Sequence, residues 1–120
     1  MTEIIENTAA STNGFAALGL SGIVLKALDT AGFEMPTPIQ EKAIPPQLKG
    51  RDILGVAQTG SGKTAAFVLP ILKDIMAMGD KRQHNTARAL IMVPTRELAV
   101  HIEECIRMFA NCAHISTALV

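Results

Sequence analysis

A glycine-rich loop constrains the fold of this chain more than any other feature of its sequence. The loop follows a short apolar run, precedes a segment with helical spacing of apolar residues, and consists of Ala57, Gln58, Thr59, Gly60, Ser61, Gly62, Lys63 and Thr64. Glycine adopts backbone angles closed to other residues, so successive N–H groups can point inward at the positive end of a helix dipole. Lys63 can reach the β- and γ-phosphates, and the Thr64 hydroxyl suits Mg²⁺. The loop therefore predicts a nucleotide phosphate site in which Lys63 and Thr64 serve catalysis.

The segments on both sides of this loop alternate between strand-like and helix-like patterns. Residues 52–57 and 89–93 are short, nearly continuous apolar runs, which suit strands buried on both faces of a parallel sheet. Apolar residues keep helical spacing over 63–78, where we expect Pro70 to kink the helix, and again from Thr95 onward. Residues 115–120 begin a third strand. The alternation predicts an α/β fold, a parallel sheet with flanking helices.

The chain divides into three parts by composition and pattern. Residues 1–14 are polar and weakly patterned, which predicts a flexible leader. Residues 15–50 contain two helical patterns, from Ser21 to Gly32 and from Thr37 to Gly50. We expect Pro45 and Pro46 to break or restart the second helix. Residues 51–120 carry the loop and the alternating segments, so we assign nucleotide binding to them.

The charge and composition exclude several classes of protein. The 11 Lys and Arg residues balance the 11 Asp and Glu residues, so any nucleic-acid contact must be local rather than a general coating by charge. The longest charge-free stretch, residues 7–25, is too polar to span a membrane. The acidic start, residues 1–6, is unlike a secretory signal, so we expect a cytoplasmic protein. Cys105 and Cys112 lie too far apart along a helix for a disulfide and are expected to be free thiols.

Three stretches of the sequence resemble the DEAD-box RNA helicases. Residues 32–40, Gly-Phe-Glu-Met-Pro-Thr-Pro-Ile-Gln, look like the Q motif of that family, and Phe15 precedes them at the family's spacing of 17 residues. The loop at 57–64 begins with alanine, as it usually does in this family. Residues 94–99, Pro-Thr-Arg-Glu-Leu-Ala, look like motif Ia. The resemblance implies a P-loop NTPase (RecA-like) fold and an ATP-dependent RNA helicase activity that couples ATP binding and hydrolysis to RNA binding and unwinding.

The resemblance and the side-chain chemistry together give roles to four further residues. An amide donates and accepts in one plane, so Gln40 could read the N6 and N7 edge of adenine, which predicts ATP over GTP. Phe15 would stack on the base, although an ordinary core phenylalanine is the competing interpretation. Thr95 and Arg96 begin a helix where free N–H groups suit an RNA phosphate. A structural salt bridge is the competing role for Arg96.

The sequence contains no Asp-Glu-Ala-Asp run, no Ser-Ala-Thr motif and no second RecA-like domain. We therefore interpret it as the N-terminal part of the first helicase domain, with an incomplete sheet and little ATP hydrolysis by itself. An exposed sheet edge would favour self-association. Two alternatives stay open: another P-loop NTPase, such as a GTPase or nucleotide kinase, and a non-catalytic fragment that binds nucleotide or RNA. Nucleotide preference tests the first alternative, and turnover tests the second.

Overall fold

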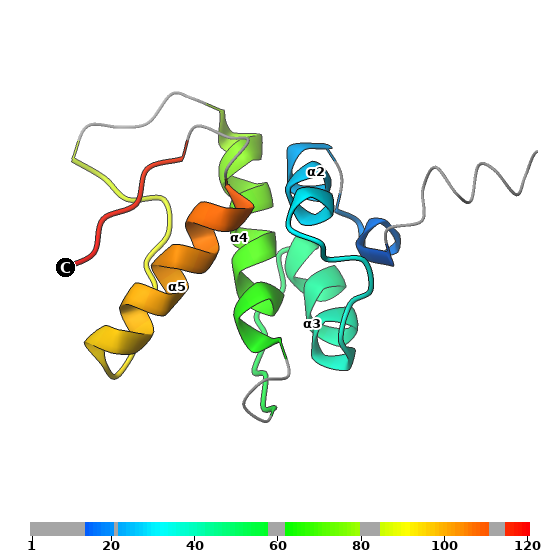
Figure 1. Ribbon diagram of the computed structural model, residues 1–120, viewed down its shortest axis with the longest axis horizontal. Coiled ribbons are helices and arrows are strands. Elements are labelled where there is room, and N and C mark those ends of the chain that lie inside the picture. The colour runs from blue at the N-terminus through cyan, green and yellow to red at the C-terminus, as the bar shows by residue number, and fades with distance from the viewer. Residues whose placement is uncertain (1–13, 21, 58–61, 80–84, 111–114) are drawn as a thin grey trace, which may run out of the picture.

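The computed structural model describes residues 14–20, 22–57, 62–79, 85–110 and 115–120. Within these ranges a short 3-10 helix precedes a set of α-helices: η1 (Gly14–Leu18), α2 (Gly22–Thr30), α3 (Pro38–Leu48), α4 (Lys63–Met78) and α5 (Arg96–Phe109). The helices expected from capping residues and apolar spacing are confirmed. Figure 1 shows α4 in the middle of the molecule, with α2 and α3 on one side and α5 on the other.

The core is built around α4. Val68, Leu69 and Leu72 of this helix are almost completely buried. They belong to one apolar cluster with residues of η1 and the other helices, among them Phe15, Val24, Leu28, Ile44, Ile102 and Phe109. The ring of Phe33 meets Phe109 edge to face at a centroid distance of 5.2 Å and lies 6.5 Å from the ring of Phe15. Because apolar burial is the main favourable term in folding, α4 is the element on which the other helices depend.

Helix α3 continues through Pro45 and Pro46, so the expected break at these prolines is wrong. A proline deprives the carbonyl four residues earlier of its donor, here Glu41 and Lys42. Both residues are exposed to solvent, where water can hydrate their main chain. Both prolines also lie in the last two turns, and the helix ends normally soon afterwards, with a positive φ of 83° at Gly50. Helix α4 likewise runs without interruption through Pro70.

The expected strands do not form within the described part of the chain. Residues 51–57, 89–93 and 115–120 belong to neither helix nor strand. A strand exists only by hydrogen bonding to a neighbouring strand, and a strand buried on both faces also needs a covering layer on each. Leu54 and Val56 are instead 93% and 86% exposed. The parallel sheet of the predicted α/β fold is therefore not confirmed.

Exposure nevertheless alternates along residues 90–93. Leu90 and Met92 are exposed, whereas Ile91 and Val93 pack against the core. This period of two is typical of a strand with one buried face. The segment is held in place by Arg88, whose guanidinium donates to the carbonyl of Gly79 at 2.6 Å, beyond the C-terminus of α4. The side chain of Arg88 therefore has a structural partner at the negative end of a helix.

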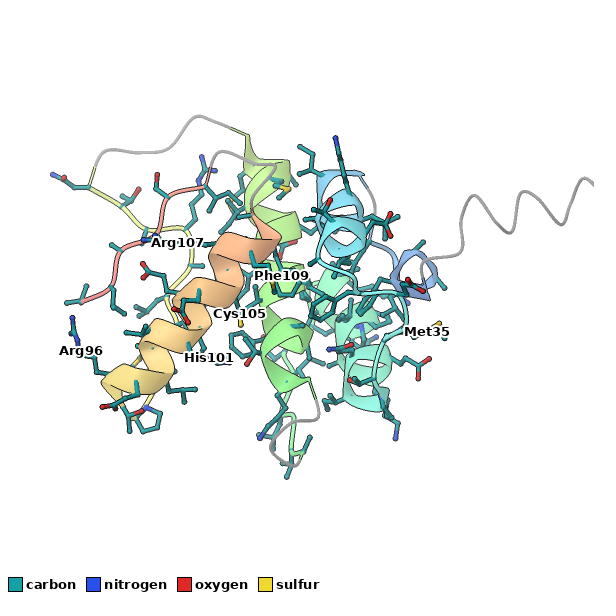
Figure 2. All side chains as sticks on the ribbon, viewed as in Figure 1. Met35, Arg96, His101, Cys105, Arg107 and Phe109 are labelled. Carbon is teal, nitrogen blue, oxygen red and sulfur yellow. The ribbon has the colours of Figure 1, made fainter. Side chains whose placement is uncertain are left out.

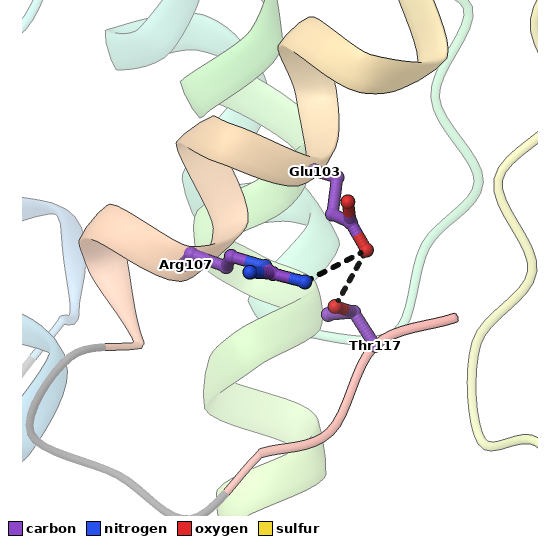
Figure 3. A network of polar contacts seen from close by, with 3 residues as sticks. All are labelled: Glu103, Arg107 and Thr117. Carbon is purple, nitrogen blue, oxygen red and sulfur yellow. Dashed lines mark hydrogen bonds and ion pairs between the residues drawn. The ribbon is translucent and has the colours of Figure 1, made fainter. Parts of the chain in front are cut away.

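The last described segment is attached to α5 by a polar network. The carboxylate of Glu103 accepts a hydrogen bond from the Thr117 hydroxyl at 2.9 Å and pairs with Arg107 at 3.5 Å, as Figure 3 shows. Ile115, two residues before Thr117, packs against the core. The network fixes residues 115–120 beside the helix without placing them in a ladder.

Leu69→Ala is expected to lower the free energy of unfolding by about 2–5 kcal/mol, because this side chain is completely buried in α4 and its removal leaves a cavity. The matched control, Leu54→Ala, removes the same atoms from an exposed position and is expected to change stability by less than about 0.5 kcal/mol. Urea unfolding followed by circular dichroism measures both. Equal losses in the two variants would contradict a core centred on α4.

Candidate nucleotide-binding site

The N-terminal ends of α3 and α4 meet at a contact between two of the predicted motifs. The side-chain Nε2 of Gln40, the last residue of the Q-like stretch, donates to the carbonyl of Gly62 in the loop at 3.1 Å. The Oε1 of the same amide accepts from the backbone N–H of Thr37 at 2.8 Å. Gln40 is 2% exposed. One buried amide therefore joins the start of α3 to Gly62, the N-cap residue of α4.

Gly62 can be only glycine in this arrangement, for two independent reasons. Its φ of 88° lies in the left-handed region, which other residues avoid. A Cβ at this position would also collide with the Gln40 amide and lie 2.9 Å from Oγ1 of Thr37. That hydroxyl oxygen is buried and has no hydrogen-bond partner among the described residues. The missing Cβ therefore lets the Gln40 amide and the Thr37 hydroxyl pack directly against the backbone at the start of α4.

Lys63 and Thr64 form the first turn of α4, as the loop pattern predicts. Lys63 is exposed, and Thr64 is half-buried. No acidic residue lies in this turn. A lysine at the positive end of a helix is electrostatically unfavourable by itself, and an anion bound there reverses the sign of the interaction. The local charge is therefore arranged for an anionic ligand.

Of the remaining loop residues, the structure describes Ala57. Ala57 is half-buried at the end of the preceding segment. Gln58, Thr59, Gly60 and Ser61 lie outside the described residues, so their predicted contacts with phosphate stay predictions.

Phe15 lies in the core close to the Q-like stretch. Its ring is completely buried, next to Phe33. The 3-10 helix that carries it is attached to this stretch by a hydrogen bond from Gly14 N–H to the Glu34 carbonyl at 2.6 Å. Phe15 thus has the structural role that was the competing interpretation, and its stacking on a base stays a prediction.

Thr95 and Arg96 occupy the start of α5, as expected from the motif Ia pattern. Thr95 is the N-cap, and its hydroxyl oxygen accepts from the Leu98 N–H at 3.2 Å. No described residue accepts a hydrogen bond from this hydroxyl, so its proton can donate to a ligand. Arg96 is exposed and points away from the other helices in Figure 2. Figure 1 places the beginnings of α3, α4 and α5 at the same end of the molecule. This end therefore gathers three positive helix termini.

Cys105 of α5 is a half-buried thiol. It is a free thiol in the structure, and Cys112 lies outside the described residues, so the expectation for the pair stays a prediction. Burial raises the pKa of the Cys105 thiol, and the Glu104 carboxylate raises it further. His101 lies on the same face of α5, its Nε2 3.9 Å from the cysteine Sγ. The described part of the chain contains no group of three or more His, Cys, Asp or Glu residues suited to a metal ion.

Comparison with known proteins decides the family. Residues 37–120 match the DEAD/DEAH box helicases. The chain belongs to the DEAD/DEAH box helicase family. It is similar to the ATP-dependent RNA helicase DBP10 of Yarrowia lipolytica, with 46% identity over 110 residues that cover 92% of this chain. It is also similar to the DEAD-box ATP-dependent RNA helicase RhpA of Helicobacter pylori, with 48% identity over 100 residues that cover 83% of the chain.

A solved helicase structure has a similar fold. The RNA helicase Prp28 from Chaetomium thermophilum, crystallised bound to ADP, superimposes with a TM-score of 0.76 and 42% sequence identity over 84% of this chain. The matched region is 24% of that helicase chain, 12% of the Yarrowia protein and 19% of the Helicobacter protein. This helicase-family chain thus spans a small part of each relative. Within its described residues no helix has the length and apolar character needed to cross a membrane.

Gly62→Ala is expected to abolish nucleotide binding and lower stability, because the new methyl group collides with the Gln40 amide and the backbone is strained. Gly50→Ala is the matched control, since Gly50 has a similar positive φ of 83° at the left-handed end of α3 and a Cβ there meets nothing within 4 Å. The control is expected to lose only about 1 kcal/mol of stability from strain. Thermal unfolding and titration with a fluorescent ATP analogue measure both variants. If Gly62→Ala were as stable as the control variant, the close contact between the Gln40 amide and the Gly62 backbone would be contradicted.

Proposed function

We propose that this chain forms the ATP-binding part of an ATP-dependent RNA helicase, with the nucleotide bound where α3 and α4 begin. The observation that carries the proposal is the hydrogen bond between the Gln40 amide and the Gly62 carbonyl. It brings a group suited to reading a base next to a loop suited to holding phosphates, as a nucleotide site requires.

The residues around Gly62 fit a bound nucleoside triphosphate and its Mg²⁺. The left-handed backbone of Gly62, the buried Thr37 hydroxyl and the exposed Lys63 all lie at the positive end of α4. Lys63 would contact the β- and γ-phosphates, and the Thr64 hydroxyl would hold Mg²⁺, which neutralises charge on the phosphate oxygens. The loop residues from Ala57 to Ser61 would add backbone N–H groups to the same anion.

The base would be recognised by Gln40, with Phe15 stacked on the ring. In the structure the Gln40 amide uses one N–H and one lone pair on main-chain groups. A primary amide has a second N–H and a second lone pair, and these form the donor and acceptor pair that the adenine edge requires. Gln40 and Phe15 are both buried, so base binding needs a local opening at the start of α3.

RNA would contact the start of α5. The Thr95 hydroxyl proton and the exposed Arg96 guanidinium are suited to a phosphate of the RNA backbone. Because the net charge of the whole chain is zero, such a contact depends on these particular groups rather than on a general attraction.

Hydrolysis and unwinding are proposed for the protein to which this chain's sequence belongs. The relatives DBP10 and RhpA are named ATP-dependent RNA helicases. The 120 residues contain no Asp-Glu-Ala-Asp run, so we expect them to hydrolyse little ATP alone. The unpaired Cys105 supports a reducing compartment, which we propose is the cytoplasm. The exposed apolar side chains of Leu54, Val56, Leu90 and Met92 support self-association of this chain.

A titration with a fluorescent ATP analogue in Mg²⁺ tests nucleotide binding. We expect displacement by ATP but not by GTP, because only adenine offers the edge that Gln40 can read. Lys63→Ala and Gln40→Ala are each expected to weaken binding at least tenfold, from loss of about 1.4 kcal/mol or more. Lys42→Ala removes another exposed lysine, from α3, and is the control, with unchanged affinity expected. Equal displacement by GTP would favour another class of P-loop NTPase.

Arg96→Ala is expected to weaken binding of a single-stranded RNA and to reduce the slope of log affinity against log salt by about 0.7, the value for one phosphate contact. Fluorescence anisotropy over a range of salt concentrations measures both quantities. The control is Arg51→Ala, since Arg51 is also exposed but follows the opposite end of α3. The same loss in both variants would indicate non-specific attraction instead of a site at α5.

A further inference from the structure

Pro70 leaves one carbonyl in the middle of α4 without its usual hydrogen-bond donor. In a regular helix the carbonyl of Ala66 accepts from the N–H of residue 70, but proline has no N–H. Ala66 is only 5% exposed, and Pro70 is itself buried in this helix, so water has little access to replace the missing donor. A buried carbonyl without a donor is costly.

Gln47 of α3 supplies that donor. Its Nε2 donates to the Ala66 carbonyl at 2.8 Å. The second hydrogen of the same amide donates to the Ala43 carbonyl, one turn earlier in α3, at 2.9 Å. Both N–H groups of the amide are therefore used, and the bond within α3 fixes the direction of the bond to α4.

Gln47 also lies on the same face of α3 as Gln40, because seven residues are about two turns. The two glutamines donate to two carbonyls of the next helix that are one turn apart, those of Gly62 and Ala66. Between these two carbonyls lie Lys63 and Thr64. The segment that is to hold the phosphates is thus bounded on each side by a hydrogen bond from α3.

We propose that Gln47 is a positioning residue for the nucleotide site, which it serves by replacing the hydrogen-bond donor that Pro70 withholds from α4. The expected effect on ATP affinity rests on the proposed function. The structural role of Gln47 rests only on its contacts. Gln47 touches no predicted ligand. It holds the first turn of α4 in register with α3, so that Lys63 and Thr64 keep a fixed relation to Gln40.

The mechanism makes a specific prediction about a second substitution. Pro70→Ala restores an N–H at position 70, which can bond the Ala66 carbonyl within α4. Gln47 then becomes dispensable. A double-mutant cycle of Gln47→Met and Pro70→Ala therefore isolates the proposed coupling, because packing changes caused by either substitution alone cancel. Met keeps the length of the side chain and removes its donors. Lys42→Met, at an exposed position of α3, controls for the introduced methionine.

We expect Gln47→Met to lower the midpoint of thermal unfolding by about 4–8 °C and to speed amide exchange about tenfold in the first two turns of α4. Exchange in α5 is expected to change much less. In the Pro70→Ala background both effects of Gln47→Met are expected to fall by more than half. If Gln47→Met alone does not fold, folding of the double variant supports the proposal, and its failure to fold contradicts it.

ATP affinity, measured where all variants are folded, separates positioning from general stabilisation. We expect Gln47→Met to weaken binding of the ATP analogue about tenfold and Pro70→Ala to restore it. An unchanged affinity, equal effects in the two backgrounds, or exchange that rises equally in α4 and α5 would overturn the proposal. If the unmodified chain binds no nucleotide, the proposed function fails, and the exchange measurements still decide whether Gln47 replaces the missing donor.

Discussion

The hydrogen bond from the Gln40 amide to the Gly62 carbonyl joins the two motifs on which the rest of the structure depends. It requires glycine at position 62, both for the left-handed backbone and for the space that a Cβ would occupy. Because the same residue is the N-cap of α4, the contact sets where this helix begins relative to α3. The core then forms around α4, with α2, α3 and α5 packed on its sides. The glycine required at position 62 thus sets the start of α4, which belongs both to the candidate nucleotide site and to the helix around which the core forms.

The prolines in α3 and α4 show how a helix tolerates the loss of a hydrogen-bond donor. Pro45 and Pro46 remove the donors for the carbonyls of Glu41 and Lys42, two exposed residues at which solvent can replace them. Pro70 removes a donor inside the molecule, where only another protein group can do so. Gln47 is that group. A carbonyl without a donor therefore has little effect at the surface but needs a protein partner in the core. In the core that partner is Gln47, whose hydrogen bond is a second link between α3 and α4.

Much of the helical structure could be predicted from the sequence because its signals are local. Thr37 with Pro38 and Thr95 with Arg96 mark helix starts, and apolar spacing gives the buried faces. The strands at 52–57 and 89–93 could not be settled this way, since a ladder depends on partners distant in the sequence. The position of Gln40 beside the loop followed from the family resemblance, whereas its bond to Gly62 is a tertiary contact that spacing does not contain. Gln47 was missed, although a proline four residues after Ala66 signals a carbonyl in need of a donor.

The central claim is that α3 and α4 together form one nucleotide site, and a two-dimensional ¹⁵N NMR titration of the chain with ATP and Mg²⁺ tests it most directly. The account predicts that the backbone amides of Gly62, Lys63 and Thr64 and the side-chain amide of Gln40 shift together along one saturation curve. Shifts confined to other parts of the chain, or no shift at these four residues in a chain that is folded, would contradict it.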